Sequence, residues 1–204
     1  MSRRKKESLQ LSEKTIVNAA IVFLKENDLK KLTIRNLASE LDIEGASLYW
    51  YIKNKQHLME LIADEICNKI EYPKLNKKAE EQIIDISFQL RNLLLTIKDS
   101  AHIMEATPPL MPNRKKLISY IYNLFKDLGM DNNELFSASW MLNNFINSSV
   151  IEEYRMLENK SSKLHQKVSD ELPFDNIEQL DLEREFRFGL EVLLLGFKEK
   201  IKEK

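Results

Sequence analysis

The fold is decided by residues 32–55, which read LTIRNLASELDIEGASLYWYIKNK. Thr33 is a suitable N-cap, and the apolar residues after it recur on one face of a helix of roughly two turns. The tight connection Asp42-Ile43-Glu44 comes next, and a second short helix is expected over residues 45–52. Two short helices joined in this way predict a helix-turn-helix.

A longer helix precedes this pair and is expected to support it. Ser12 is a suitable N-cap for that helix, and Asn27-Asp28 ends it. Such short helices are not stable alone, so the pair has to pack against the longer helix. Apolar residues expected in the core of the pair are Leu37, Leu41, Ile43, Leu48 and Ile52. Any three-helix cluster shows such a pattern, so periodicity alone leaves the function open.

The other face of the second short helix carries residue types suited to DNA. Its start, Gly45-Ala46-Ser47, is small, which lets the backbone approach base edges and phosphates. Tyr49-Trp50-Tyr51 place three aromatic rings on a largely exposed helix, which is unfavourable unless the rings cover something. Such rings can contact thymine methyls, and tyrosine hydroxyls can reach phosphates. Lys53 and Lys55 follow, and Asn54 between them is a suitable N-cap for the next helix. Lys55 begins that helix, where the helix dipole also favours a phosphate.

The charge of the chain is unevenly distributed. Overall, 31 Lys and Arg nearly balance 32 Asp and Glu, for a net charge of −1. Residues 1–55 hold 11 of the basic and 7 of the acidic residues, so the rest of the chain is acidic. A basic end on an acidic body favours a head that faces a polyanion, although chance asymmetry is the alternative.

The remaining residues predict a larger helical body. Glycine (4) and proline (5) are scarce, which favours long helices. We expect an all-α fold with a flexible basic arm at 1–11, a helix-turn-helix domain with a linking helix at 12–72 and a body at 73–204. Prolines interrupt residues 99–112, and the polar stretch 159–179 is expected to be a mobile loop. Helices of the body are expected over 79–98, 113–127, 133–157 and 180–201.

Several classes of protein are disfavoured by what the sequence lacks. A single cysteine, Cys67, excludes an intrachain disulfide, and its periodic setting predicts a small buried side chain. No apolar run is long enough for a bilayer and no signal core follows the basic start, so we expect a cytoplasmic protein without a membrane partner. Without a phosphate loop, a metal-ligand cluster or a nucleophile motif, we expect no enzyme, no cofactor and no metal. A helical small-molecule carrier is a further alternative, but it leaves the basic head unexplained.

Two stretches carry a resemblance to a known family. Residues 32–38 and 48–55 resemble the DNA-binding head of the TetR family, and within it the tetracycline-repressor branch. The resemblance implies a transcription regulator, usually a repressor that a small molecule releases from its operator; a regulator without an effector, or an activator, is the alternative. It also implies that Arg35 reads a guanine, that Thr33 lies near a phosphate and that Lys55 contacts the DNA backbone. The residues expected at DNA are Thr33, Arg35, Glu44, Gly45, Ala46, Ser47, Tyr49, Trp50, Tyr51, Lys53 and Lys55.

The head also departs from the family pattern in two places. The tetracycline-repressor branch has a Gln-Pro pair where this chain has Gly45-Ala46. Glycine cannot replace the hydrogen bonds of a base-reading glutamine, so a different operator is expected. The family usually has glycine in the turn, where this chain has Asp42. Aspartate tolerates a left-handed backbone better than most residues, so the turn is expected to survive.

For the body, the resemblance implies a twofold dimer on palindromic double-stranded DNA. Two half-sites need two heads. Family members dimerise through the last helix and an earlier long helix, which here match 181–201 and 133–157. Packing within one chain alone is the alternative. The residues expected at the dimer interface are Phe186, Gly189, Leu190, Leu193, Leu194 and Phe197.

An effector pocket is also expected in the body. A histidine that helps bind the magnesium-chelated drug in the tetracycline-repressor branch is matched here by Met104, and a second ligand-contacting histidine by Ile70. A thioether is a poor ligand for magnesium, so we expect a metal-free and largely apolar effector. Any of the expected lining residues could instead be a core residue. The lining expected is Ile66, Ile70, Ile86, Leu90, Met104, Thr107, Phe145, Ser149 and Glu152.

Overall fold

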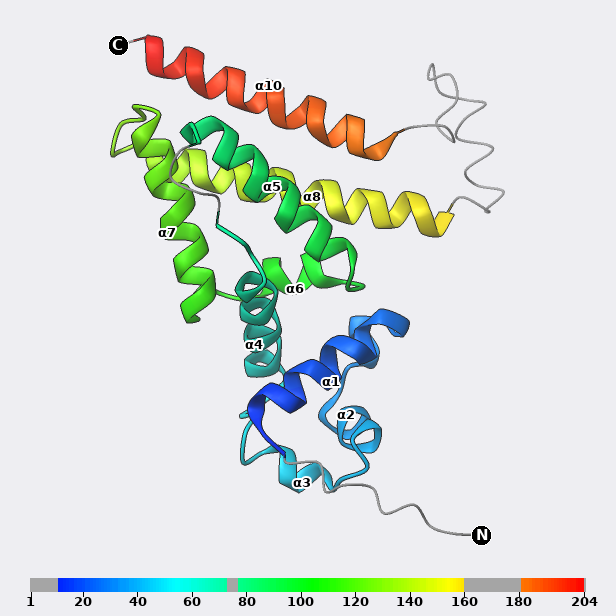
Figure 1. Ribbon diagram of the computed structural model, residues 1–204. Helices are drawn as coiled ribbons and strands as arrows, with labels where there is room; N and C mark the ends of the chain where they lie inside the picture. The colour runs from blue at the N-terminus through cyan, green and yellow to red at the C-terminus, as the bar shows by residue number, and fades with distance from the viewer. Residues whose placement is uncertain (1–10, 73–76, 160–180, 204) are drawn as a thin grey trace.

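The computed structural model describes residues 11–72, 77–159 and 181–203, and every regular element within these ranges is a helix (Figure 1). A small N-terminal head and a larger body are joined through α4 (Figure 1). Nearly all of the predicted basic arm and of the predicted loop over 159–179 lies outside the described residues, as does the predicted boundary at Pro73.

The head consists of short elements whose starts are fixed by side-chain caps. All three predicted N-caps are confirmed: Ser12 Oγ accepts from the Thr15 amide at 3.1 Å, Thr33 Oγ1 from that of Asn36 at 3.1 Å, and Asn54 Oδ1 from that of His57 at 2.8 Å. The elements of the head are α1 (Glu13–Glu26), the 3-10 helix η1 (Leu29–Lys31), α2 (Ile34–Glu40), α3 (Gly45–Leu48) and α4 (Lys55–Asn68).

The second helix of the motif is shorter than expected. The α-helical part of α3 ends at Leu48, whose carbonyl accepts from both the Tyr51 and Ile52 amides, at 3.0 and 2.8 Å. Leu48 and Ile52 are fully buried, as are Leu37 and Leu32, whereas Leu41 and Ile43 are only half-buried at the rim of the head core. The aromatic residues between the two buried positions therefore stay on the outside.

Asp42 makes the turn between α2 and α3. Its φ is 56°, in the left-handed region that the sequence predicted it to tolerate. The Asp42 amide donates to the Ser39 carbonyl at 3.2 Å, and the Ile43 amide to the Ala38 carbonyl at 3.0 Å. These two bonds form a Schellman motif, which satisfies the last carbonyls of α2 and turns the chain sharply into α3.

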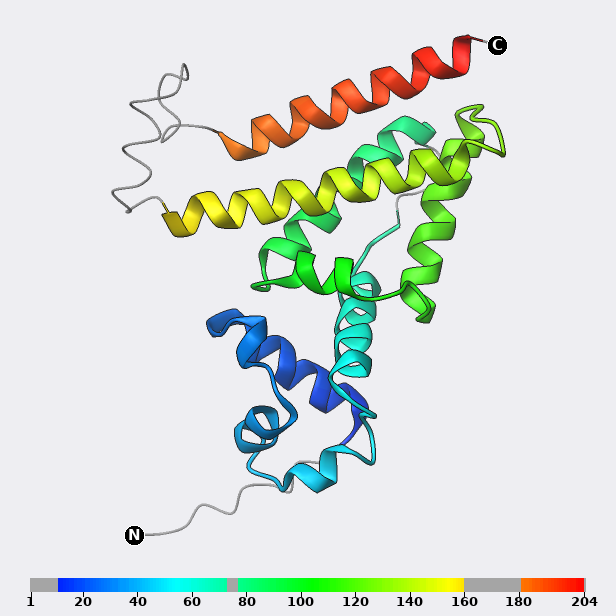
Figure 2. The same cartoon turned by 180° about the vertical axis from the view of Figure 1, so that it is seen from behind.

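The body is built from longer helices. In both views, α8 and α10 lie side by side at the end of the molecule far from the head, and α4 runs up between head and body (Figures 1 and 2). Pro112 begins α7, and Gly129, with φ of 95°, follows its end. The body contains α5 (Ala79–Leu95), α6 (Ser100–Ala106), α7 (Pro112–Asp127), α8 (Leu135–Asn159) and α10 (Leu182–Lys202).

The face of α10 that was predicted to form the dimer interface is instead buried within the single chain. Phe186 lies between two rings of its own chain. It is edge-on to Phe88, with 5.1 Å between the ring centroids, and stacked on Phe145, with 5.2 Å between the centroids. Gly189 also faces Phe145, since a Cβ there would lie 2.6 Å from the ring. Periodicity alone could not separate this face from a second apolar face of α10, which is exposed. Of the predicted interface, the buried residues are Phe186, Leu190, Leu194 and Phe197, and Leu193 is half-buried.

Candidate DNA-binding face and effector cavity

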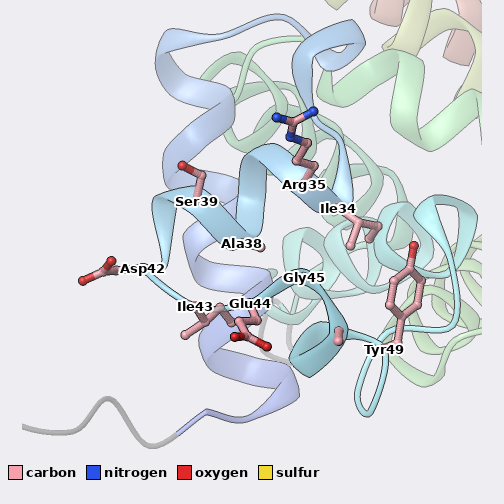
Figure 3. Close-up of a pocket in the computed structure, with 10 residues that line it drawn as sticks. Ile34, Arg35, Ala38, Ser39, Asp42, Ile43, Glu44, Gly45 and Tyr49 are labelled. Carbon is pink, nitrogen blue, oxygen red and sulfur yellow. The ribbon is translucent and has the colours of Figure 1, made fainter.

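An open groove of about 750 Å³ lies between α2 and α3 (Figure 3). Five of the residues predicted to contact DNA line it, so the turn brings together residues from both helices. The lining residues are Ile34, Arg35, Ala38, Ser39, Asp42, Ile43, Glu44, Gly45, Ala46 and Tyr49.

The groove presents two groups that can read base edges. Arg35 is exposed on α2, and its guanidinium has no hydrogen bond or ion pair within the described residues. Glu44 is exposed immediately before α3, and Figure 3 places the two side chains at different ends of the groove. A free guanidinium suits the acceptors of guanine and a carboxylate suits the amino group of cytosine. The groove can therefore discriminate between bases.

The three consecutive aromatic residues are exposed, as predicted. The exposed fraction is 60% for Tyr49, 88% for Trp50 and 37% for Tyr51. Their neighbours Leu48 and Ile52 are fully buried, so the outward position of the rings is fixed by the core. A cluster of this kind on a monomer surface marks a binding face.

The polar residues at the edge of this face differ in whether their side chains already make hydrogen bonds within the chain. Thr33 is exposed, and its hydroxyl oxygen is already the N-cap acceptor of α2. Ser47 is half-buried and Lys53 is exposed. The ammonium of Lys55 donates to the Leu29 carbonyl at 2.9 Å, so it stabilises the head as well as facing its surface. The expected phosphate contact of Lys55 therefore competes with its hydrogen bond to the Leu29 carbonyl.

The head is tied to the body at two places. The first is α4, where Gln56 Nε2 donates to the Ala106 carbonyl at 3.1 Å and Asp64 Oδ1 accepts from the Asn113 and Arg114 amides at 2.8 and 3.0 Å. Asp64 thus caps α7 from α4. Asp64 therefore links α7 to the helix that carries Lys55.

The second tie joins η1 to the turn before α6. The Leu29 amide donates to Asp99 Oδ2 at 2.7 Å. Lys98 Nζ lies 2.7 Å from Asp28 Oδ1 and 2.6 Å from Glu158 Oε1. The hydrogen bond from Lys98 lowers the pKa of Asp28 below its usual range. No sequence pattern predicts this tie, because it joins residues about 70 positions apart.

The body contains a small cavity of about 30 Å³ between α4, α5, α6, α7 and α8. Only Leu90 and Met104 of the nine predicted pocket residues line it. The remaining lining residues were not predicted. The complete lining is Cys67, Leu90, Met104, Arg114, Leu117, Ile118, Ile121, Ser139, Asn143 and Ile146.

The other predicted pocket residues lie elsewhere in the body. Ile66 and Ile86 are fully buried, and Ile70 is 6% exposed, so all three belong to the core, the alternative that the sequence left open. Glu152 is half-buried and pairs with Arg155 at 2.6 Å.

Three more of the predicted pocket residues serve the structure of the body. The Thr107 hydroxyl donates to the Ile103 carbonyl at 2.7 Å. Phe145 stacks on Phe186, and the Ser149 hydroxyl donates to the Phe145 carbonyl at 2.7 Å. None of the three lines the cavity.

Two residues of the cavity have pKa values that burial moves. Burial raises the pKa of the Cys67 thiol to about 12, and this side chain is 1% exposed, as predicted for a small buried residue. Burial lowers the pKa of Arg114, although a guanidinium stays charged at any physiological pH. Over the part of the chain that the structure describes, no cluster of His, Cys, Asp or Glu could hold a metal ion.

A helix-turn-helix groove with exposed aromatic residues, joined by one helix to a separate body with an internal cavity, defines a DNA-binding regulator of two parts. The chain belongs to the TetR family: residues 72–201 match the domain described as tetracycline repressor-like, C-terminal. TetR-family proteins are transcription regulators rather than enzymes. Among the described helices, none is long and apolar enough to cross a membrane.

Relatives and solved structures agree with this assignment. The chain is 28% identical to the class E tetracycline repressor of Escherichia coli, over 96% of this chain and 94% of the relative. It is 24% identical to the class G tetracycline repressor of Vibrio anguillarum, over 92% and 94% of the two chains. The structure of the TetR-family protein ActR of Streptomyces coelicolor in complex with actinorhodin superimposes with a TM-score of 0.83, at 25% identity, over 94% of this chain and 98% of ActR.

Proposed function

We propose that this chain is a cytoplasmic transcriptional repressor that binds a palindromic operator as a homodimer and leaves it when a small molecule enters the body. The observation that carries the DNA-binding part is the groove of Figure 3, with Arg35 and Glu44 in it and Tyr49-Trp50-Tyr51 exposed beside it. Water is a poor environment for three exposed rings, and a DNA groove would cover them.

The operator is expected to differ from that of the tetracycline repressors. Gly45 and Ala46 line the groove and supply no side-chain hydrogen bond, so they permit close approach but do not read a base. Base reading then depends on Arg35 and Glu44, which favour a G·C pair at each contacted position. Thr33, Ser47, Lys53 and Lys55 would contact phosphates and fix the register.

We infer the dimer from an apolar stripe on the outer face of α10. Phe188 is 64% exposed, Val192 52% and Leu195 57%, at spacings of four and three residues along the helix. They lie opposite the face that is buried within the chain. On α8, Phe136 and Trp140 are also exposed, at 72% and 57%. A second copy of the chain would cover both helices.

The release mechanism follows from the size and position of the cavity. A cavity of about 30 Å³ holds about one water molecule, whereas ligand sites typically occupy roughly 300–1,000 Å³. A ligand must therefore move the walls apart. One wall is α7, which Asp64 ties to α4, so opening the cavity would tilt α4 and the head it carries. The ActR complex with actinorhodin supports a small molecule as the effector.

The small size of the cavity also favours one alternative, a regulator without an effector. Thermal unfolding of the full chain across a compound panel separates the two, because a bound ligand raises the melting temperature. Under the proposed mechanism the coupling is reciprocal, so operator DNA must weaken effector binding by the same factor.

The DNA-binding proposal is tested by selection from a random duplex pool, followed by sequencing of the retained DNA. We expect a palindrome that contains G·C pairs in each half-site and differs from the tetracycline operator. Retention without any preferred sequence would mean that the protein binds DNA only through its phosphates. The variant Arg35→Ala is expected to relax the preference at one position of each half-site by about 1–3 kcal/mol.

A further inference from the structure

Arg114 is a charged residue inside the body. It lies in the first turn of α7 and is only 6% exposed. It shares a helix face with the buried Leu117 and Ile121, and all three line the cavity. A guanidinium at this position of an apolar face is unusual, because buried charges are normally paired with an opposite charge.

The partners of Arg114 are all neutral. Its Nη1 donates to the Thr107 carbonyl at 2.9 Å and to Thr107 Oγ1 at 2.6 Å, and its Nη2 donates to the Met104 carbonyl at 3.1 Å. No carboxylate lies within ion-pair distance of the Arg114 guanidinium among the described residues. Asp64 accepts from the backbone amide of Arg114.

A second buried arginine in the same body shows the usual arrangement. Arg91 is 4% exposed, and Glu153 pairs with it through both carboxylate oxygens, at 2.7 and 2.9 Å from Nη2 and 3.1 Å from Nε. Arg91 does not line the cavity. The buried arginine with a carboxylate partner thus lies outside the cavity, and the one without such a partner lies against it.

Capping of α6 uses only some of the hydrogen-bond donors of Arg114. The Met104 and Thr107 carbonyls belong to the C-terminal end of α6, where a cation is favourable. A guanidinium carries five N–H donors, and the described contacts use three of them. The Nε–H and one Nη2–H are left without an acceptor within the described residues, and these two nitrogens form one edge that binds a carboxylate with two hydrogen bonds.

The rest of the cavity fits a small amphipathic molecule. Ser139 also lines it, and its hydroxyl is buried without a hydrogen-bond partner in the described part of the chain. Asn143 adds an amide one turn further along α8, and the other walls are apolar or thiol side chains. Ile118 borders the cavity and is 41% exposed, so the cavity reaches the surface beside α7.

We propose that the effector carries a carboxylate, which pairs with Arg114, on an apolar body that fills the widened cavity. The inference rests on the proposed function, because it names the chemistry of that effector. It replaces the expectation of a largely apolar effector with that of an organic acid. Asp64 and Glu60 attract the guanidinium only from beyond ion-pair distance, so the carboxylate supplies the hydrogen-bonded counter-charge that Arg114 lacks. Ser139 and Asn143 add neutral hydrogen bonds.

The test compares acids with neutral molecules of the same shape. The probes are hexanoate, octanoate, benzoate and 2-naphthoate, each beside its primary carboxamide, added to the full-length protein. We expect at least one acid to raise the melting temperature and to bind about tenfold or more tightly than its amide in calorimetry. If no acid stabilises the protein, or if the amides bind as tightly, the proposal is overturned.

Three variants assign the preference to Arg114. The acid preference should vanish in Arg114→Gln and fall in Arg114→Lys, because an ammonium lacks the two-pronged geometry. The matched control Arg91→Lys, a buried arginine outside the cavity, should keep the full preference. If Arg114→Gln does not fold, the contrast between the two lysine variants decides. An unchanged preference in Arg114→Lys would overturn the proposal.

Operator retention by the same preparation separates this inference from the proposed function. Retention of a palindrome without acid preference overturns only the acid effector. Acid preference without any DNA retention overturns the repressor and leaves an organic-acid binding site.

Discussion

At the scale of single residues, two aspartates adopt a left-handed backbone and serve different purposes. Asp42 has φ of 56° and turns the chain from α2 into α3. Asp99 has φ of 58° just before α6, and its carboxylate accepts the Leu29 amide of the head. Left-handed backbone costs most L-residues roughly 1–2 kcal/mol, and aspartate is among those that tolerate it. The same tolerance thus shapes the DNA-binding motif and one tie between head and body.

The thiol of Cys67 should make the protein less stable in alkali. Burial raises its pKa from 9.0 to about 12, so the folded thiol keeps its proton where the unfolded thiol loses it. The unfolded state then binds fewer protons, and the free energy of unfolding falls as pH rises from about 9 toward 12, by at most about 1.4 kcal/mol per pH unit from this group. Urea unfolding at several pH values measures the slope. An equal slope in Cys67→Ala would contradict the assignment.

Gly189 and Gly196 should respond in opposite ways to alanine. A Cβ at Gly189 would lie 2.6 Å from Cε2 of Phe145, a ring that cannot withdraw easily because it stacks on Phe186. We expect Gly189→Ala to lower the free energy of unfolding by about 1–3 kcal/mol. A Cβ added at Gly196 would meet no side chain of the described residues within 4 Å, so Gly196→Ala should raise the free energy of unfolding by up to about 1 kcal/mol. Denaturant titration of both variants measures the difference, and equal losses would contradict the intrachain contact.

At the scale of helices, the head is held by α4 and also by η1. The η1 tie combines the Leu29–Asp99 hydrogen bond with the ion pairs of Lys98 to Asp28 and Glu158. Because Glu158 lies near the end of α8, this tie connects the head to a helix of the proposed dimer interface. Two ties restrict the head more than one hinge would.

Removal of the Asp99 carboxylate should loosen η1 without straining the turn. Glycine accepts φ of 58°, so Asp99→Gly removes only the acceptor of the Leu29 amide. We expect exchange of that amide with solvent deuterium to quicken about tenfold, as a charged hydrogen bond is lost. The control Asp42→Gly makes the same change at the other left-handed aspartate and should leave the Leu29 amide unaffected. Similar exchange rates of the Leu29 amide in both variants would show that the Asp99 carboxylate does not protect it.

The sequence predicted those features of the helices that depend on near neighbours. Ser12, Thr33 and Asn54 cap helices that begin one residue later, and the turn at Asp42 depends on local backbone preference. The pocket and the buried face of α10 depend on which helices meet in space, so periodicity could not decide them. Arg114 could have been noticed in the sequence, because it is a charged residue at a position that continues the apolar spacing of Leu117 and Ile121.

At the scale of the whole molecule, function requires two heads at a fixed separation. The head lies at one end of the molecule and α10 lies at the other (Figure 2). A twofold dimer through α8 and α10 would fix the separation of its two heads. The distance between the heads, and hence operator affinity, would then depend on the body.

A charge in the α10 stripe should separate the subunits. Val192 is 52% exposed, and a buried carboxylate at a dimer interface would lack a partner, so we expect Val192→Glu to be a folded monomer. Sedimentation equilibrium measures the mass, and helical circular dichroism verifies the fold. The matched control Val22→Glu changes a valine of similar exposure, 59%, on α1 and should leave the mass unchanged. A dimer of Val192→Glu would place the interface elsewhere.

The spacing of the two half-sites tests the central claim most directly. The operator selected from the random pool would be compared with a duplex in which about five base pairs, half a helical turn, are inserted at its centre. Two heads held rigidly by one dimer predict a loss of affinity of about 100-fold or more, because the second half-site turns to the opposite side of the DNA. Equal affinity for both duplexes would mean that each head binds alone, and would contradict the dimeric repressor.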